Sequence, residues 1–230
     1  MPRIARIVGV GYPHHITQRG NYRQEIFEDN KDREKYLALL HIESKRYKLN
    51  IIAYCLMTNH VHFIGVPERD DAMGNTFKYM NMKYSQYFNR KKGEKGHLFQ
   101  GRFFSSIMDG YHTLACARYI ERNPVRAKMA ENPWDWKWSS AEAHCGVREK
   151  EYLREKLLFD YIEIGKHGWK EFIGQQDDPE EVKKIKEETM KGRPIADSDF
   201  IKELGKRLKR DLVIKAKGRP KKKKEKESEK

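Results

Sequence analysis

Residues 50–67 decide the fold; they read Asn-Ile-Ile-Ala-Tyr-Cys-Leu-Met-Thr-Asn-His-Val-His-Phe-Ile-Gly-Val-Pro. Two runs rich in β-branched and aromatic residues flank a break at residues 57–60, which predicts two antiparallel strands joined tightly. Side chains alternate between the faces of a strand, so His60 and His62 project from one face, roughly 6.6 Å apart. Two imidazoles held this way can bind one divalent cation, but a solvated strand face can carry the same pair by chance.

Length and composition limit the class of protein. The 230 residues suit one domain of ordinary size with an appendage. No run of 18 or more apolar residues occurs, so we expect no membrane span, and the N-terminus lacks the apolar core of a signal peptide. The three cysteines are an odd number without a C-x-x-C pair, which favours a reducing cytoplasm over a zinc-thiolate site or disulfides.

The net charge of +14 favours a polyanionic partner. Residues 1–146 hold 23 Lys/Arg and 15 Asp/Glu, and residues 147–230 hold 25 and 19, so both parts are basic. Nucleic acid is the partner that this charge predicts. A charge excess that only keeps the protein in solution is the alternative.

The elements around the hairpin indicate the fold class. We expect strands over residues 12–19 and 104–108, and helices over residues 31–47, 76–90 and 111–123, the last ended by Pro124. The resulting order is strand, helix, strand, strand, helix, strand, helix. This is an α+β, ferredoxin-like split-βαβ pattern: an antiparallel sheet with helices on one face and the other face available for a ligand.

The third expected helix adds a nucleophile. Tyr119 and Asn123 are four residues apart, so they share a helix face about 6 Å apart along the axis. If this helix crosses near the histidines, Tyr119 can reach a phosphate held on the cation, and Asn123 can offer its amide oxygen as a third ligand. Taken singly, Tyr119 can be a packing residue and Asn123 a helix end before Pro124.

Several spaced motifs resemble one family. They are His-Val-His after Met-Thr-Asn, Arg118 to Arg126, His97 to Phe103, His15 to Asn21, and Trp138-Ser139-Ser140. Together they resemble the single-tyrosine HUH transposases, in particular the REP-associated tyrosine transposases, over about residues 10–146.

The resemblance implies an HUH endonuclease fold and a role for each motif residue. His60 and His62 would bind Mg²⁺ or Mn²⁺, and Tyr119 would attack single-stranded DNA to form a 5′-phosphotyrosine, releasing a 3′-OH that permits rejoining. Asn123 would be the third metal ligand; here the sequence departs from better-known relatives, which commonly carry Gln or an acidic residue at this place. No general base adjoins Tyr119 in the sequence, which leaves activation of its phenol, with a reference pKa of about 10, to the metal or the substrate.

The DNA contacts expected from the sequence are spread along the chain. They are Arg19, Gln100, Arg102, Arg122 and Arg126. The alternative for each is a polar or charged side chain that lies on the surface and contacts only solvent. Phe99 and Phe103 can stack on unpaired bases or pack in the core.

The composition changes after Gly146. We therefore expect a catalytic domain over residues 1–146, a helical appendage over 147–210 and a basic, disordered tail over 211–230. Lys-Gly-Arg-Pro occurs twice, and the copy containing Arg219 resembles an AT-hook that enters the minor groove of duplex DNA; a solubilising tail is the alternative.

The leading hypothesis is therefore a metal-dependent transposase that cleaves and rejoins single-stranded DNA at hairpins of palindromic repeats. We expect a cytoplasmic, nucleoid-associated monomer or homodimer. A non-catalytic DNA-binding regulator that retains the fold is the alternative. A replication initiator of the same superfamily is a third, but the chain has no room for a helicase domain.

Overall fold

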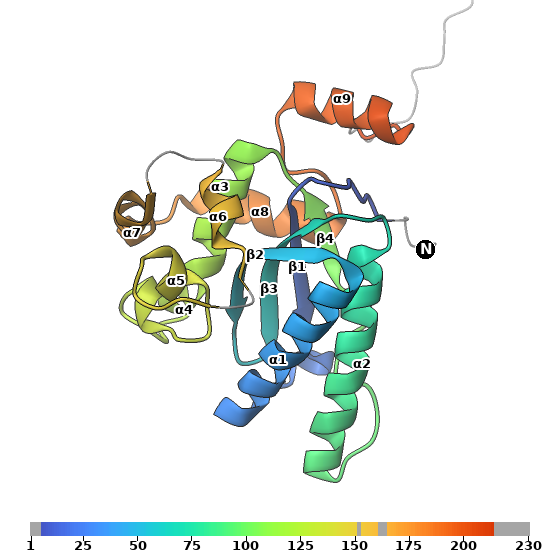
Figure 1. Cartoon of the computed structure of the whole chain (residues 1–230), viewed down its shortest axis with the longest axis vertical. Coiled ribbons are helices and arrows are strands. Elements are labelled where there is room, and N and C mark those ends of the chain that lie inside the picture. Colours follow the sequence, from blue (N-terminus) through green and yellow to red (C-terminus); the bar gives the residue numbers. More distant parts are fainter. Residues whose placement is uncertain (1–5, 151–152, 161–164, 214–230) are drawn as a thin grey trace, which may run out of the picture.

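A four-stranded antiparallel sheet organises the computed structural model, which describes residues 6–150, 153–160 and 165–213 (Figure 1). Its strands are β1 (His14–Arg19), β2 (Leu49–Leu56), β3 (His60–Pro67) and β4 (Phe104–Ile107). Their order in the sheet is β2-β3-β1-β4, and each neighbouring pair is antiparallel. This is the order of a ferredoxin-like split-βαβ sheet, so the predicted fold class is confirmed.

Two long helices cover one face of the sheet. They are α1 (Asn30–Tyr47) and α2 (Ala72–Lys92), and α2 begins four residues earlier than the sequence pattern predicts. Their apolar stripes pack on Val61 and Phe63 of β3. Tyr36 and Tyr84 meet edge to face between the two helices, with ring centroids 4.8 Å apart. The Met and aromatic residues of α2 therefore belong to the core.

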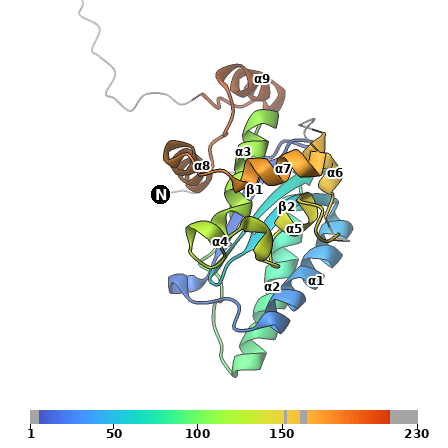
Figure 2. The same ribbon diagram turned by 90° about the vertical axis from the view of Figure 1, so that its left-hand side faces the viewer.

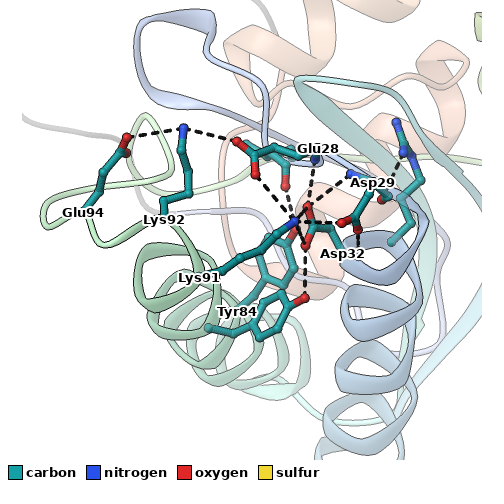
Figure 3. A network of polar contacts seen from close by, with 10 residues as sticks. Glu28, Asp29, Asp32, Tyr84, Lys91, Lys92 and Glu94 are labelled. Carbon is teal, nitrogen blue, oxygen red and sulfur yellow. Dashed lines mark hydrogen bonds and ion pairs between the residues drawn. The ribbon is translucent and has the colours of Figure 1, made fainter.

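A buried carboxylate fastens the two helices together (Figure 3). Asp32 in the first turn of α1 accepts hydrogen bonds from Lys91 at 2.9 Å and Tyr87 at 3.0 Å, both near the end of α2. Asp29 caps α1 by accepting from the backbone N–H of Asp32, and it also pairs with Lys91. Because Asp32 is fully buried, its charge is compensated by partners from the neighbouring helix.

Helices also cover the second face of the sheet, so the expectation of a free face is wrong (Figure 2). The helix α3 (Gly110–Glu121) crosses β2 and β3, and the short α4 (Asn123–Arg126) follows it. Ile64 of β3 packs in a second core with Trp169 and Ile185 from the C-terminal third of the chain. The remaining short elements are η1 (Asn21–Arg23), η2 (Pro133–Asp135) and α5 (Ala141–His144).

Four helices form the C-terminal third. Among the residues described there, they are α6 (Glu155–Phe159), α7 (Gly165–Gly174), α8 (Pro179–Lys191) and α9 (Ser198–Leu208), all within the expected helical appendage. Although α8 is rich in charged residues, its Ile185 and Thr189 are each 1% exposed against the sheet and α3.

The predicted division into three domains stays a prediction, although residues 153–195 contribute side chains to both cores. Most of the expected tail, including Arg219, lies outside the described residues. Within those residues, no helix has both the length and the apolar composition needed to cross a membrane.

Candidate metal and tyrosine site

The structure brings His60, His62 and Tyr119 together on the second face of the sheet. The two histidines lie on one face of β3, with ring centroids 5.1 Å apart. The helix α3 crosses this face and places the ring of Tyr119 5.6 Å from the ring of His62. Residues almost sixty positions apart therefore form one cluster.

Hydrogen bonds to Nδ1 orient the ring of each histidine and thereby the direction of its Nε2 atom. His60 Nδ1 lies 2.7 Å from the amide oxygen of Asn59, which only accepts, so Nδ1 carries the proton and Nε2 keeps a lone pair. His62 Nδ1 lies 2.9 Å from His15 Nε2, and His15 Nδ1 lies 2.7 Å from the hydroxyl of Thr189. With the tautomers in which His62 donates to His15 and His15 donates to Thr189, Nε2 of His62 also keeps a lone pair.

Burial keeps these imidazoles neutral. It lowers the pKa of His60 to about 4 and that of His15 to about 3, and it holds the pKa of His62 well below its ordinary value. Nearby positive charge from Arg19 acts in the same direction on His60 and His62. Neutral imidazoles with free Nε2 lone pairs are the donors that a divalent cation requires, so His60 and His62 fit a metal site.

Asn123, the predicted third ligand of such a cation, carries an amide in place of a carboxylate or imidazole. Among the residues that the structure describes, no cluster of three or more such side chains is arranged to hold a metal. Asn123 is buried, and its amide oxygen accepts a hydrogen bond from Arg126 at 2.9 Å. A carbonyl oxygen has two lone pairs, so one stays available, and its role as third ligand stays a prediction.

The phenol of Tyr119 is a weak acid in this environment. The residue is 4% exposed, and burial raises its pKa to about 12. The guanidinium of Arg126 lies 4.5 Å from the centre of its ring and opposes this shift. Formation of a phenolate at neutral pH therefore needs additional positive charge near the oxygen.

The predicted DNA contacts divide into two groups. Arg122 and Arg126 are bound by the protein itself: both pair with Asp177 at 3.0 Å, and Arg122 also donates to the carbonyl of Ile173 at 2.6 Å. Arg19, Gln100 and Arg102 are exposed. Arg19 pairs across the sheet with His60, and its carbonyl accepts from the backbone N–H of Gln100.

Sequence reasoning missed the residues that support the site. His15 lies in β1 on the face that carries His60 and His62, and the period of two in residues 15, 17 and 19 could have identified it. The contact of Thr189 with His15 could not be predicted from the neighbouring sequence, because it depends on the packing of α8 against β1.

Glu121 is a second unpredicted support, two residues after the tyrosine. It is fully buried, and its carboxylate accepts from Ser140 and His144 at 2.5 Å and from the indole of Trp169 at 2.9 Å. These bonds anchor the end of α3 that carries Tyr119.

The chain is similar to known proteins in sequence and in fold. Residues 11–123 match the sequence model of the family described as IS200-like transposases. A solved structure of a REP-associated tyrosine transposase bound to a REP hairpin is similar in fold, with a TM-score of 0.52 and 18% sequence identity over 67% of this chain and 98% of that one. Among proteins with curated annotation, none matches this sequence.

Proposed function

From the premise that residues 11–123 place this chain in the IS200-like transposase family, we propose that it cleaves and rejoins single-stranded DNA through a covalent link to Tyr119. The observation that carries the proposal is the meeting of Tyr119 with two histidines, each of which makes its hydrogen bond through Nδ1. A protein that only binds DNA has no need of this combination.

The chemistry follows from the residues present. The oxygen of Tyr119 attacks a backbone phosphorus, the bond from phosphorus to the 3′ oxygen breaks, and the proton lost by the phenol balances the one gained by the new 3′-OH. The product is a 5′-phosphotyrosine, and attack by a 3′-OH reverses the step. When bound by His60, His62 and Asn123, Mg²⁺ or Mn²⁺ would polarise the phosphate and offset the charge that develops on it.

Arg126 has a supporting part in this scheme. Its guanidinium over the ring of Tyr119 favours the phenolate that forms during attack. The exposed Arg19, opposite His60, is placed to bind a phosphate of the strand that enters the site. The hairpin in the similar solved structure supports palindromic repeat hairpins as substrate.

The test is to incubate the full chain with labelled single-stranded palindromic repeats and Mn²⁺ and to look for a covalent adduct on a denaturing gel. An adduct that resists boiling in detergent supports the proposal. No adduct in either Mg²⁺ or Mn²⁺, from protein that binds the same DNA, would contradict it.

One observation favours the second candidate, a DNA-binding regulator without catalysis. Tyr119 and His62 are 4% and 6% exposed, which leaves little of either side chain for a phosphate to contact. The same assay separates the two candidates, because a regulator binds the hairpin and forms no adduct. Duplex binding by the tail, nucleoid association and a monomeric or homodimeric state stay predictions.

A further inference from the structure

A groove of about 730 Å³ lies away from the tyrosine site, between α2 and the segment 96–103. Arg6, Lys78, His97 and Arg102 are among its lining residues, and none of the described residues that line it is acidic. The chain as a whole carries 34 Asp and Glu residues. A groove of this size with basic groups only fits an anionic ligand.

Two guanidinium groups at one end of the groove lack an acidic partner. Arg6 stacks on the ring of Phe103, 3.6 Å from its centre, and donates to the Phe103 carbonyl at 3.0 Å. Arg102 lies close enough to lower the pKa of Arg6, which burial and this repulsion bring to about 10. Within the described part of the chain, neither arginine forms an ion pair, so a phosphate between them would relieve their repulsion.

The α2 wall offers groups suited to a nucleobase. The side-chain oxygen of Asn81 is buried and has no hydrogen-bond partner among the described residues. Met82 is 45% exposed, so its apolar side chain is accessible to a ligand in the groove. Phe77 and Leu98 also line the groove. A flat ring with an N–H at its edge would satisfy the Asn81 oxygen and cover Met82.

We infer that this groove binds one unpaired nucleotide of a DNA strand, with its phosphate between Arg6 and Arg102 and its base against Met82 and Asn81. The inference rests on the proposed function, since it assigns the nucleotide to the same DNA substrate. It adds a binding site separate from the residues that perform the chemistry.

Hydrogen bonds connect the groove to the tyrosine site. The side chain of Gln18 in β1 donates to the carbonyl of Gly101 at 2.9 Å, and the N–H of Gln100 donates to the carbonyl of Arg19 at 2.9 Å. Arg19 is the cross-strand neighbour of His60. These bonds hold the segment 96–103 against the strand that carries Arg19, so a DNA strand that leaves the groove past Gln100 and Arg19 would approach the histidines.

The test measures DNA binding by the full chain carrying Tyr119→Phe, so that cleavage does not disturb equilibrium. Labelled oligo(dT) and a blunt duplex of equal length are titrated against three variants. The first removes both arginines (Arg6→Gln with Arg102→Gln). The second fills the groove without a charge change (Ser85→Phe). The third is a charge-matched control on α1 (Lys45→Gln with Arg46→Gln).

We expect the arginine pair and the groove-filling variant each to weaken oligo(dT) binding by roughly tenfold to a hundredfold, the range for loss of charge-assisted hydrogen bonds. The α1 control and duplex binding should change by less than about threefold. Thermal unfolding of each variant identifies misfolding, and Ser85→Tyr replaces Ser85→Phe if that variant fails to fold.

Three results would overturn the inference. Equal losses in the arginine pair and the α1 control would show unspecific electrostatics. Unchanged oligo(dT) binding by a folded groove-filling variant would show that the base lies elsewhere. Displacement of oligo(dT) by thymidine monophosphate at equal nucleotide concentration would show a site for free nucleotides. Adduct formation by the protein with Tyr119 intact is measured separately, so failure of the groove and failure of the proposed function are distinguishable.

Discussion

The hydroxyl of Thr189 lies 2.7 Å from Nδ1 of His15, although 174 positions separate the two residues in the sequence. Because His15 Nε2 in turn lies 2.9 Å from Nδ1 of His62, a threonine of α8 supports the orientation of a predicted metal ligand through His15. We expect Thr189→Val, which keeps the shape and removes the hydroxyl, to weaken Mn²⁺ binding by roughly tenfold to a hundredfold. Isothermal titration of the folded variant measures this, and Thr189→Ser should restore binding. An unchanged isotherm for the valine variant would contradict it.

Tyr119→Phe removes only the phenolic oxygen, and no hydrogen bond of that oxygen supports the described fold. The variant should fold and bind DNA normally, while the covalent adduct disappears. Adduct formation on a denaturing gel and DNA binding by fluorescence anisotropy provide the two readouts. An adduct that survives the change would place the nucleophile elsewhere.

Substitution of either histidine should remove the metal-dependent activity. His60→Ala and His62→Ala each delete a nitrogen ligand, so cleavage should fall below detection and the Mn²⁺ isotherm should become flat. His41→Ala on α1 is the matched control. Normal cleavage in excess chelator would refute metal dependence.

Acid should destabilise the fold through His14. This residue is fully buried, its Nδ1 donates to the carbonyl of Tyr12, and its Nε2 accepts from the N–H of Gly9, so only the neutral ring satisfies both partners. Burial lowers its pKa from 6.5 to about 4. The unfolded chain therefore binds a proton first as the pH falls below 6.5, and stability is lost between pH 6.5 and 4.

The expected loss from His14 alone is about 2 kcal/mol of unfolding free energy between pH 7 and pH 5. Urea denaturation at the two pH values measures it. His14→Gln should be less stable at pH 7 and less sensitive to the change in pH. An equal acid sensitivity in the variant would assign the effect to other buried histidines.

Deletion of residues 214–230 tests the tail without disturbing Arg210, whose side chain donates to the carbonyl of Arg6. The deletion removes 9 basic and 3 acidic residues. Duplex affinity should fall and its salt dependence should become shallower, by about 0.9 in the log–log slope for each phosphate that the protein no longer neutralises. Hairpin cleavage at saturating protein should persist. An unchanged salt slope would show that the tail does not touch DNA.

The parts of the fold that follow from local periodicity were predictable. The alternation in residues 60–66 placed both histidines on one face, and the helical stripe containing Tyr36 and Leu40 identified α1. The burial of one face of α8 could not be predicted from its sequence, because its buried residues, Ile185 and Thr189, stand among mostly charged neighbours. Tertiary packing decided the burial of that helix, and local composition could not reveal it.

The arginines show a second limit of sequence reasoning. A guanidinium binds protein carbonyls and carboxylates as readily as phosphates, so the sequence could not tell Arg122, which pairs with Asp177, from the exposed Arg102. The unpaired Asn81 oxygen was equally hidden, since only the packed helix shows that it lacks a partner.

The carboxylate of Glu121 has a consequence for how this protein could be divided or recombined. Two of its partners, Ser140 and His144, precede Gly146, but Trp169 follows it. A chain cut at Gly146 would leave one carboxylate oxygen without its donor and would strip the apolar cover from α3. The matched region of residues 11–123 is therefore not an independent unit, and transferring it into another protein would require the later residues to be transferred with it.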